Sequence, residues 1–207
     1  MLETLLAMDP ATIATFAGAG TLLNLTPGTD VVFASASGLA GGPRAGIAAA
    51  AGISLGSLAH SCLAALGLSA LIAANPLAYD AIRWLGAAYL LFLAVQAWRT
   101  QPGAARIKGE ISLYPALKRG FLTNILNPKV ALFILAFLPQ FTTPAAGPIW
   151  QQILILGLIF SATGLVITSA YGATAGLMRH AMSRAAGTLD KITALVFAAL
   201  AARLIWD

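Results

Sequence analysis

The sequence predicts an all-α protein, a polytopic membrane bundle of about six transmembrane helices arranged as two inverted three-helix repeats. The first observation is composition: 59% of the 207 residues are hydrophobic and 9% are charged, whereas roughly a quarter of the residues in a soluble domain are charged. The second is a series of apolar stretches, each near the roughly 20 residues that a helix needs to cross a bilayer. The third is a similarity between the two halves of the chain.

Three apolar stretches in the first half are expected to span the membrane. The first covers about residues 11–37 and is interrupted in its middle by Pro27-Gly28. The second covers about 45–74 and carries no formal charge. The third covers about 82–98 and has an arginine near each end, where a long basic side chain can reach water.

Three further stretches are expected in the second half. The fourth covers about 120–141 and contains Pro128. The fifth, about 150–178, is free of charge, and the sixth covers about 185–206. The two halves are joined by a connection at about 100–118, whose mixture of basic and apolar residues fits either a loop on anionic headgroups or a solvated linker.

Basic residues set the expected orientation. With six spans, Arg83 and Arg203 fall on one side of the membrane. The opposite side carries eight basic residues: Arg44, Arg99, Arg106, Lys108, Lys118, Arg119, Arg179 and Arg184. Cytoplasmic connections carry the excess of Lys and Arg, so both termini are expected on the outer side of the membrane. The net charge of +5 then reflects orientation and does not indicate a nucleic-acid partner.

An internal comparison predicts a duplication. A shift of 101 residues superposes four pairs: Pro27 on Pro128, Gly56 on Gly157, Arg83 on Arg184 and Gly86 on Gly187. Each half, about 11–99 and about 119–206, then holds three spans. An odd number of spans turns the second half upside down relative to the first, which is the inverted-repeat plan of secondary transporters. The whole chain, 1–207, is expected to form one transmembrane transporter domain.

The two interrupted spans are the expected site. Backbone polar groups in lipid need partners, so a broken helix is tolerated where protein or a water-filled cavity surrounds it. Freed carbonyls and a new helix start could hold both ends of a zwitterion. The alternative is an ordinary proline kink relieved by a neighbouring helix. The residues of these breaks are Asn24, Pro27, Gly28, Asn124, Asn127 and Pro128.

Two charged residues follow the breaks. Asp30 lies three residues after Pro27, and Lys129 follows Pro128 directly. An ionisable group near the bilayer centre is rare without a function or a partner, so both are candidates for substrate binding or proton coupling, and the two could meet near the midplane. The alternative for Asp30 is a favourable first-turn interaction with the helix dipole.

His60 lies on a stripe of small residues, Ala48, Gly52, Gly56 and Ala64, which lets helices approach closely. The histidine is therefore expected to point into the bundle. It could relay protons near neutral pH or only bond a neighbour.

Three runs of sequence carry a resemblance to a known family. They are NLTPGTDVVFASASGLAGGPRAGIAAAAGISLGSLAH from residue 24, WLGAAYLLFLAVQAWR from residue 84 and GFLTNILNPKVALFILAFLPQF from residue 120. Together they resemble the lysine exporter (LysE) and homoserine/threonine resistance (RhtB) family over nearly the whole chain. The resemblance implies an efflux carrier of the bacterial inner membrane that exports amino acids or derivatives and is driven by the proton-motive force.

This chain departs from the family pattern at two positions. The family usually has a second proline where this chain has Thr29, and often an acidic residue where it has Ser57. The first change loosens the expected helix break, and the second removes a candidate proton carrier.

The expected partners are an amino acid or derivative, protons and the lipid bilayer, and the sequence is compatible with a homo-oligomer. No enzymatic activity, cofactor or metal is expected, because the sequence has no nucleophile triad or phosphate-binding loop. A membrane scaffold or sensor remains an alternative function. So does a redox membrane protein, although that class needs paired cysteines or haem-ligating histidines and the chain has one cysteine and two histidines.

Overall fold

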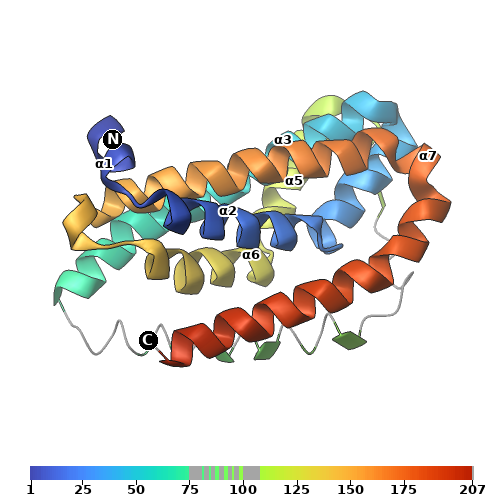
Figure 1. Ribbon diagram of the computed structural model, residues 1–207. Helices are drawn as coiled ribbons and strands as arrows, with labels where there is room; N and C mark the ends of the chain where they lie inside the picture. The colour runs from blue at the N-terminus through green and yellow to red at the C-terminus, as the bar shows by residue number, and fades with distance from the viewer. Residues whose placement is uncertain are drawn as a thin grey trace.

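All of the regular structure that the computed structural model describes is helical (Figure 1). The description covers residues 1–74 and 108–206 and, between these ranges, the helical positions Ala81, Trp84, Ala87, Ala88, Leu91, Phe92, Val95, Trp98 and Arg99. Over these residues the all-α prediction is confirmed. Most of the third expected span, including Arg83 and Gly86 of the repeat comparison, lies outside them.

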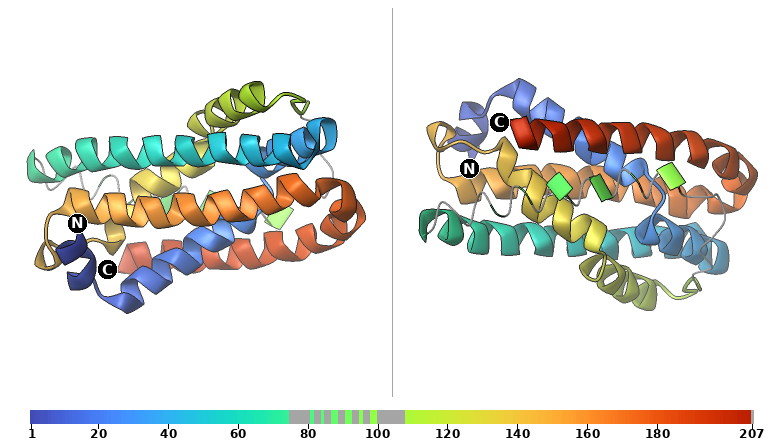
Figure 2. Two further views of the ribbon diagram at one scale, coloured as in Figure 1. Left: turned by 90° about the horizontal axis from the view of Figure 1, so that it is seen from above. Right: turned by 90° about the horizontal axis from the view of Figure 1, so that it is seen from below.

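The first expected span consists of two helices. After a short helix α1 (Leu2–Ala7), α2 covers Pro10–Leu25 and α3 starts at Thr29 and ends at Ala74. Inside α3, Gly42 has a φ of 78° and Pro43 follows it. Glycine tolerates that left-handed φ without strain, and the chain turns back there, so α3 has two arms (Figure 2). The second arm contains the expected span 45–74.

Asp9 fixes the start of α2. Its carboxylate accepts hydrogen bonds from the backbone N–H groups of Ala11 and Thr12, and Pro10 occupies the first helical position, where a missing N–H does no harm. The Thr12 hydroxyl donates to the same carboxylate at 2.9 Å. This hydroxyl first, and the two amides with it, lower the pKa of the Asp9 carboxyl from its usual value.

The fourth expected span is also broken. Helix α5 covers Leu113–Ile125 and α6 starts at Pro128 and ends at Leu132. The chain then continues through a π-helical turn, η1 (Phe133–Phe137), and a 3₁₀ turn, η2 (Leu138–Phe141). The two parts are bent by 54° at the break. α5 starts seven residues before the predicted span, because Ala116 packs into a buried cluster with α3.

After a 3₁₀ turn, η3 (Pro144–Ala146), helix α7 covers Ile149–Trp206. We predicted separate helices at about 150–178 and 185–206, and α7 includes both without an interruption in its helical assignment. No proline lies between the two predicted spans. Figure 1 shows α7 curving round so that its last part runs back beneath the rest of the bundle.

The apolar helices make this a membrane protein. Among the described residues, Thr29–Gly67 and Ile149–Ala175 are each long and apolar enough to cross a bilayer, and the bent pair of α5 with α6 would make a third span. The first of these ranges contains the reversal at Gly42.

Aromatic side chains hold the break in the second half against α2 and α7. Phe16 of α2 lies 6.0 Å from Phe133 and 5.4 Å from Phe141, measured between ring centroids. Phe160 of α7 lies 5.2 Å from Phe133. These rings form the centre of a larger buried apolar cluster, so the irregular turns η1 and η2 are fixed by packing.

Glycines bring the other helices together. A Cβ at Gly38 or Gly46, one on each arm of α3, would overlap the backbone of Gly172 in α7. On the predicted stripe of small residues, a Cβ at Gly52 would overlap the backbone of α5, and one at Gly56 would lie 2.7 Å from the side-chain oxygen of Asn124. The stripe therefore faces α5, and close helix packing is its confirmed role.

Candidate functional site

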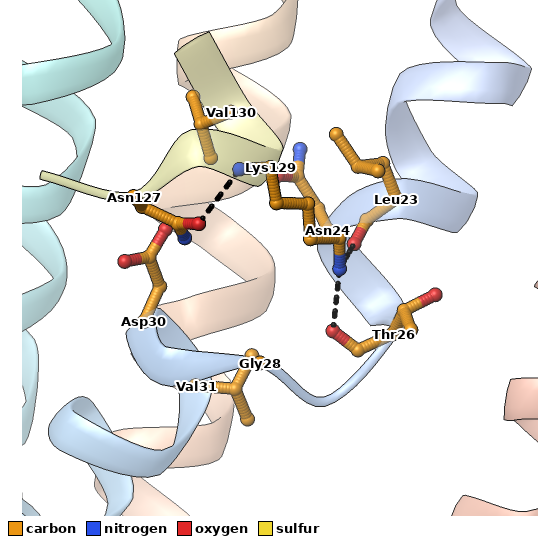
Figure 3. Close-up of a pocket in the computed structure, with 9 residues that line it drawn as sticks. All are labelled: Leu23, Asn24, Thr26, Gly28, Asp30, Val31, Asn127, Lys129 and Val130. Atoms are coloured by element: carbon orange, nitrogen blue, oxygen red, sulfur yellow. Dashed lines mark hydrogen bonds between the residues drawn. The ribbon is translucent and has the colours of Figure 1, made fainter. Parts of the chain in front are cut away.

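A pocket lies where the break between α2 and α3 meets the start of α6 (Figure 3). It has about 280 Å³ of empty space, part of it open to the outside. Its lining combines one acidic, one basic, several polar and several apolar residues: Leu23, Asn24, Thr26, Gly28, Asp30, Val31, Asn127, Lys129 and Val130. Five of these were predicted from the sequence.

The break in the first half is held by side chains from the second half. Pro27 has no N–H, so the carbonyl of Leu23 cannot receive its usual helical hydrogen bond. Lys129 donates from Nζ to that carbonyl at 3.1 Å and to the carbonyl of Thr26 at 3.3 Å. The hydroxyl of Tyr171 donates to the carbonyl of Leu25 at 3.0 Å. These carbonyls therefore already have partners within the protein.

The break between α5 and α6 directs the side chain of Lys129 towards the break between α2 and α3. Asn127 caps α6 by accepting a hydrogen bond from the backbone N–H of Lys129 at 3.0 Å. Pro128 takes the first helical position, where its fixed φ suits a helix start. The Lys129 side chain then extends across the pocket towards the end of α2 (Figure 3).

Asp30 lies in the first turn of α3, with 9% of its surface exposed. Its Oδ2 accepts a hydrogen bond from Nδ2 of Asn124 at 2.8 Å. Its Oδ1 is buried and has no hydrogen-bond partner among the described residues. Asn127, Lys129 and His60 are the other polar groups near this carboxylate. The site thus presents a buried acceptor atom at the edge of a pocket.

Asn124 lies behind the pocket and is completely buried. Its Oδ1 accepts from the hydroxyl of Ser57 at 3.3 Å, and its backbone carbonyl lies 3.3 Å from Nε2 of His60. It therefore connects Asp30 to two polar side chains on the second arm of α3. His60 points into the bundle as predicted, but it reaches Asp30 through Asn124 and does not line the pocket.

Asn24 lines the pocket from α2 and is hydrogen-bonded to α7. Its amide donates from Nδ2 to the carbonyl of Phe160 at 3.2 Å and to the hydroxyl of Thr163 at 3.3 Å. Gly164 leaves room for it, because a Cβ there would lie 3.3 Å from the Asn24 amide. The amide is thus held by α7.

The sequence analysis identified the two helix breaks that meet at this pocket, but it missed some of the residues that form the site. Leu23 was not singled out, although its position four residues before Pro27 marks its carbonyl as the one deprived of a donor. Nothing local in the sequence indicates that the hydroxyl of Tyr171 reaches α2. Ser57 was noted only because the family often has an acidic residue at this position, and its hydrogen bond to Asn124 was not predicted.

The described residues offer one carboxylate, one ammonium, amides and backbone carbonyls to the pocket. Such groups can bind a small zwitterion through hydrogen bonds. No cluster of three or more His, Cys, Asp or Glu side chains suited to a metal ion occurs within the described part of the chain.

Comparison with known proteins gives a family match. A family model described as "LysE type translocator" matches residues 21–207. An "Uncharacterized membrane protein" of Vibrio cholerae is 34% identical over 74% of this chain and 76% of its own length. A "Homoserine/homoserine lactone efflux protein" of Salmonella typhimurium is 32% identical over 75% and 76%. A "Leucine efflux protein" of Enterobacter sp. is 33% identical over 64% of each chain. No solved structure matches.

Proposed function

The chain belongs to the LysE type translocator family, and from this premise we propose that it exports amino acids or closely related small metabolites across the bacterial inner membrane. The family is one of translocators, which makes the protein a transporter and not an enzyme. The efflux names of two relatives support the direction of transport and the substrate class.

One observation carries the proposal: the buried Oδ1 atom of Asp30 has no partner within the described part of the chain and lies beside a pocket. A buried acceptor without a hydrogen bond is unfavourable. A primary ammonium group of a substrate would supply a charge-assisted hydrogen bond at that atom. Asp30 is therefore the proposed partner of the substrate's ammonium group.

The rest of the lining favours a neutral zwitterion. Lys129 balances the formal charge of Asp30 in the pocket wall, so a substrate with a further charge of either sign would leave that charge without a fixed partner. Leu23, Val31 and Val130 provide apolar contact for a short side chain.

The proposed architecture is one domain of six spans over residues 1–207, with two inverted repeats at about 11–99 and 119–206. Two observations support it. Each half is broken at the proline that the repeat comparison pairs, Pro27 and Pro128. The paired Gly56 and Gly157 both lie at close helix contacts, the first against Asn124 and the second against Ser61. Such repeats place substrate sites at the interface of the two broken helices.

The same carboxylate would couple export to protons. If a proton and a substrate ammonium compete for Oδ1 of Asp30, the carrier leaves the cytoplasmic side with substrate and returns from the periplasmic side with a proton. Each cycle then exchanges one for the other. Asn124 links this carboxylate to His60, a second group that can hold a proton near neutral pH. The excess of basic residues in one set of connections supports periplasmic termini.

Transport by the purified protein tests the proposal. Everted vesicles or proteoliposomes would be given a pH gradient and a panel of labelled neutral, basic and acidic amino acids. We expect accumulation of one or more neutral amino acids, abolished by a protonophore and nearly absent with Asp30→Asn. Lys118→Ala, which changes an exposed lysine on α5, is the matched control and should transport normally. Absence of gradient-driven movement for every member of the panel would contradict the proposal.

A further inference from the structure

The carbonyls of Leu23 and Thr26 lie at the broken end of α2 and line the pocket wall. The carbonyl of Leu23 receives no helical hydrogen bond because Pro27 lacks an N–H. The carbonyl of Thr26 lies just beyond the last residue of α2, Leu25, and so takes no part in the hydrogen bonds of that helix. Two carbonyl oxygens left near each other in this way offer negative partial charge to a cation. The fold has therefore built a position for a cation at the break.

The structure fills this position with its own cation. Nζ of Lys129 donates to the carbonyl of Leu23 at 3.1 Å and to that of Thr26 at 3.3 Å (Figure 3). The lysine belongs to the other half of the chain, more than a hundred residues away. Gly28 lies beside the ammonium group, where even a Cβ would be at an ordinary contact distance of 3.7 Å from Nζ.

We propose that these carbonyls form a binding site for small primary ammonium ions and that Lys129 is its built-in occupant. A lysine ammonium is a compact charge with three N–H donors on a flexible stem. The contacts that it makes here use the ammonium alone, so a free alkylammonium ion of similar size can make them too. A quaternary ammonium ion cannot, because it has no N–H to donate.

The proposal gives the transport site two ammonium positions. One is the open acceptor Oδ1 of Asp30 and the other is the carbonyl pair that Lys129 fills. When the two halves move apart in a transport cycle, a substrate's amino group becomes a competitor of Lys129 for the carbonyls. This last step rests on the proposed function, whereas the existence of the carbonyl site does not.

Removal of the built-in occupant tests the site. The variant Lys129→Ala should unfold at a lower temperature than the parent in detergent. Added n-propylammonium should raise the melting temperature of the variant saturably, by about 3 to 10 °C for a ligand well above its dissociation constant. Tetramethylammonium at the same concentration and ionic strength should have no such effect. The parent should respond less than the variant, because Lys129 occupies its carbonyl site and only Oδ1 of Asp30 is left to bind the ion.

Two control variants sharpen the test. Lys118→Ala removes an exposed lysine and should behave like the parent with both ions. Lys129→Ser also leaves the space of the lysine stem empty for n-propylammonium, and it is the second variant if the alanine protein is not obtained folded. Purification would then be carried out with n-propylammonium present from solubilisation onward, which should restore the missing contacts and the yield.

Three results would overturn the inference. The first is an equal response of the parent and the Lys129 variants to n-propylammonium. The second is an equal effect of tetramethylammonium. The third is failure to obtain either Lys129 variant even with n-propylammonium present. Because the readout is melting temperature, a parent that moves no amino acid would defeat the proposed function and leave this site standing.

Discussion

Asn124 donates a hydrogen bond from Nδ2 to Oδ2 of Asp30 at 2.8 Å, joining two residues that are 94 positions apart in the chain. The amide thereby fixes one oxygen of the carboxylate and leaves the other, Oδ1, buried without a hydrogen-bond partner among the described residues. Because Asn124 also accepts from Ser57, it connects the breaks of α2–α3 and α5–α6 to the second arm of α3.

Loss of this amide should destabilise the fold. Asn124→Ala leaves the Asp30 carboxylate buried without its Asn124 donor, at about 1 to 3 kcal/mol for a buried group left unsatisfied. The Ser57 hydroxyl loses one acceptor but keeps the carbonyl of Ile53 at 3.4 Å. Thermal unfolding in detergent measures it. In a double-mutant cycle with Ser57→Ala, we expect the second change to cost about 0.5 to 1.5 kcal/mol less in the Asn124→Ala background. Strict additivity would show that the Ser57 contact contributes nothing.

Gly56 is predicted to tolerate no side chain. A Cβ there would lie 2.7 Å from Oδ1 and 2.8 Å from Cβ of Asn124, so Gly56→Ala should cost about 1 to 3 kcal/mol of stability through overpacking. Gly67→Ala is the matched control on the same helix, because nothing lies within 4 Å of a Cβ at that position. It should be neutral or stabilising by about 0.5 to 1 kcal/mol. Equal effects of the two substitutions would exclude close packing at Gly56.

The orientation predicted from basic residues can be read with reporters. A reporter fused after Asp207 should be active in the periplasm, and one inserted at Gly109 should be active in the cytoplasm, because the six-span arrangement separates the two sites by three spans. Paired alkaline phosphatase and green fluorescent protein fusions give opposite signals on the two sides. The same location for both reporters would contradict six spans.

The Asp9 cap should make stability fall at acid pH. Hydrogen bonds from Thr12 and Ala11 lower the folded-state pKa of this carboxyl below its usual 3.8. Its contribution is therefore fully present above the unfolded pKa and is lost as pH falls through the lower folded pKa. Asp9→Asn keeps a capping oxygen but does not titrate, so its melting temperature should fall less than that of the parent on acidification to pH 3. Parallel curves for the two proteins would argue against the cap.

Much of the fold followed from local sequence, whereas the site's connections did not. Pro27-Gly28 and Pro128 predicted the two breaks, since the effect of proline on the backbone needs no tertiary contact. The partner of each freed carbonyl could not be predicted, because it depends on which helices meet. Lys129 was expected near Asp30, and the two line the same pocket, but the ammonium of Lys129 donates to the carbonyls of Leu23 and Thr26. A zwitterion can therefore use the carbonyls only by displacing Lys129.

Some helix ends could likewise be predicted from local sequence, and others could not because they depend on packing. Asp9 with Pro10 at the start of α2, and Asn127 with Pro128 at the start of α6, are capping patterns visible in sequence. The earlier start of α5 was not visible, because Ala116 is helical through its packing on α3.

The central claim is that Oδ1 of Asp30 binds the ammonium group of the substrate, and its most direct test compares ligands that differ only in that group. An amino acid that the parent transports and its 2-hydroxy acid analogue would compete against labelled substrate in gradient-free exchange, in the parent and in Asp30→Asn. The amide retains an oxygen for Asn124 and so preserves the local structure. We predict that the parent prefers the amino acid by about 10- to 150-fold, the value of one charge-assisted hydrogen bond, and that this preference collapses in Asp30→Asn. The same preference in both proteins would contradict the account and would place the ammonium site elsewhere.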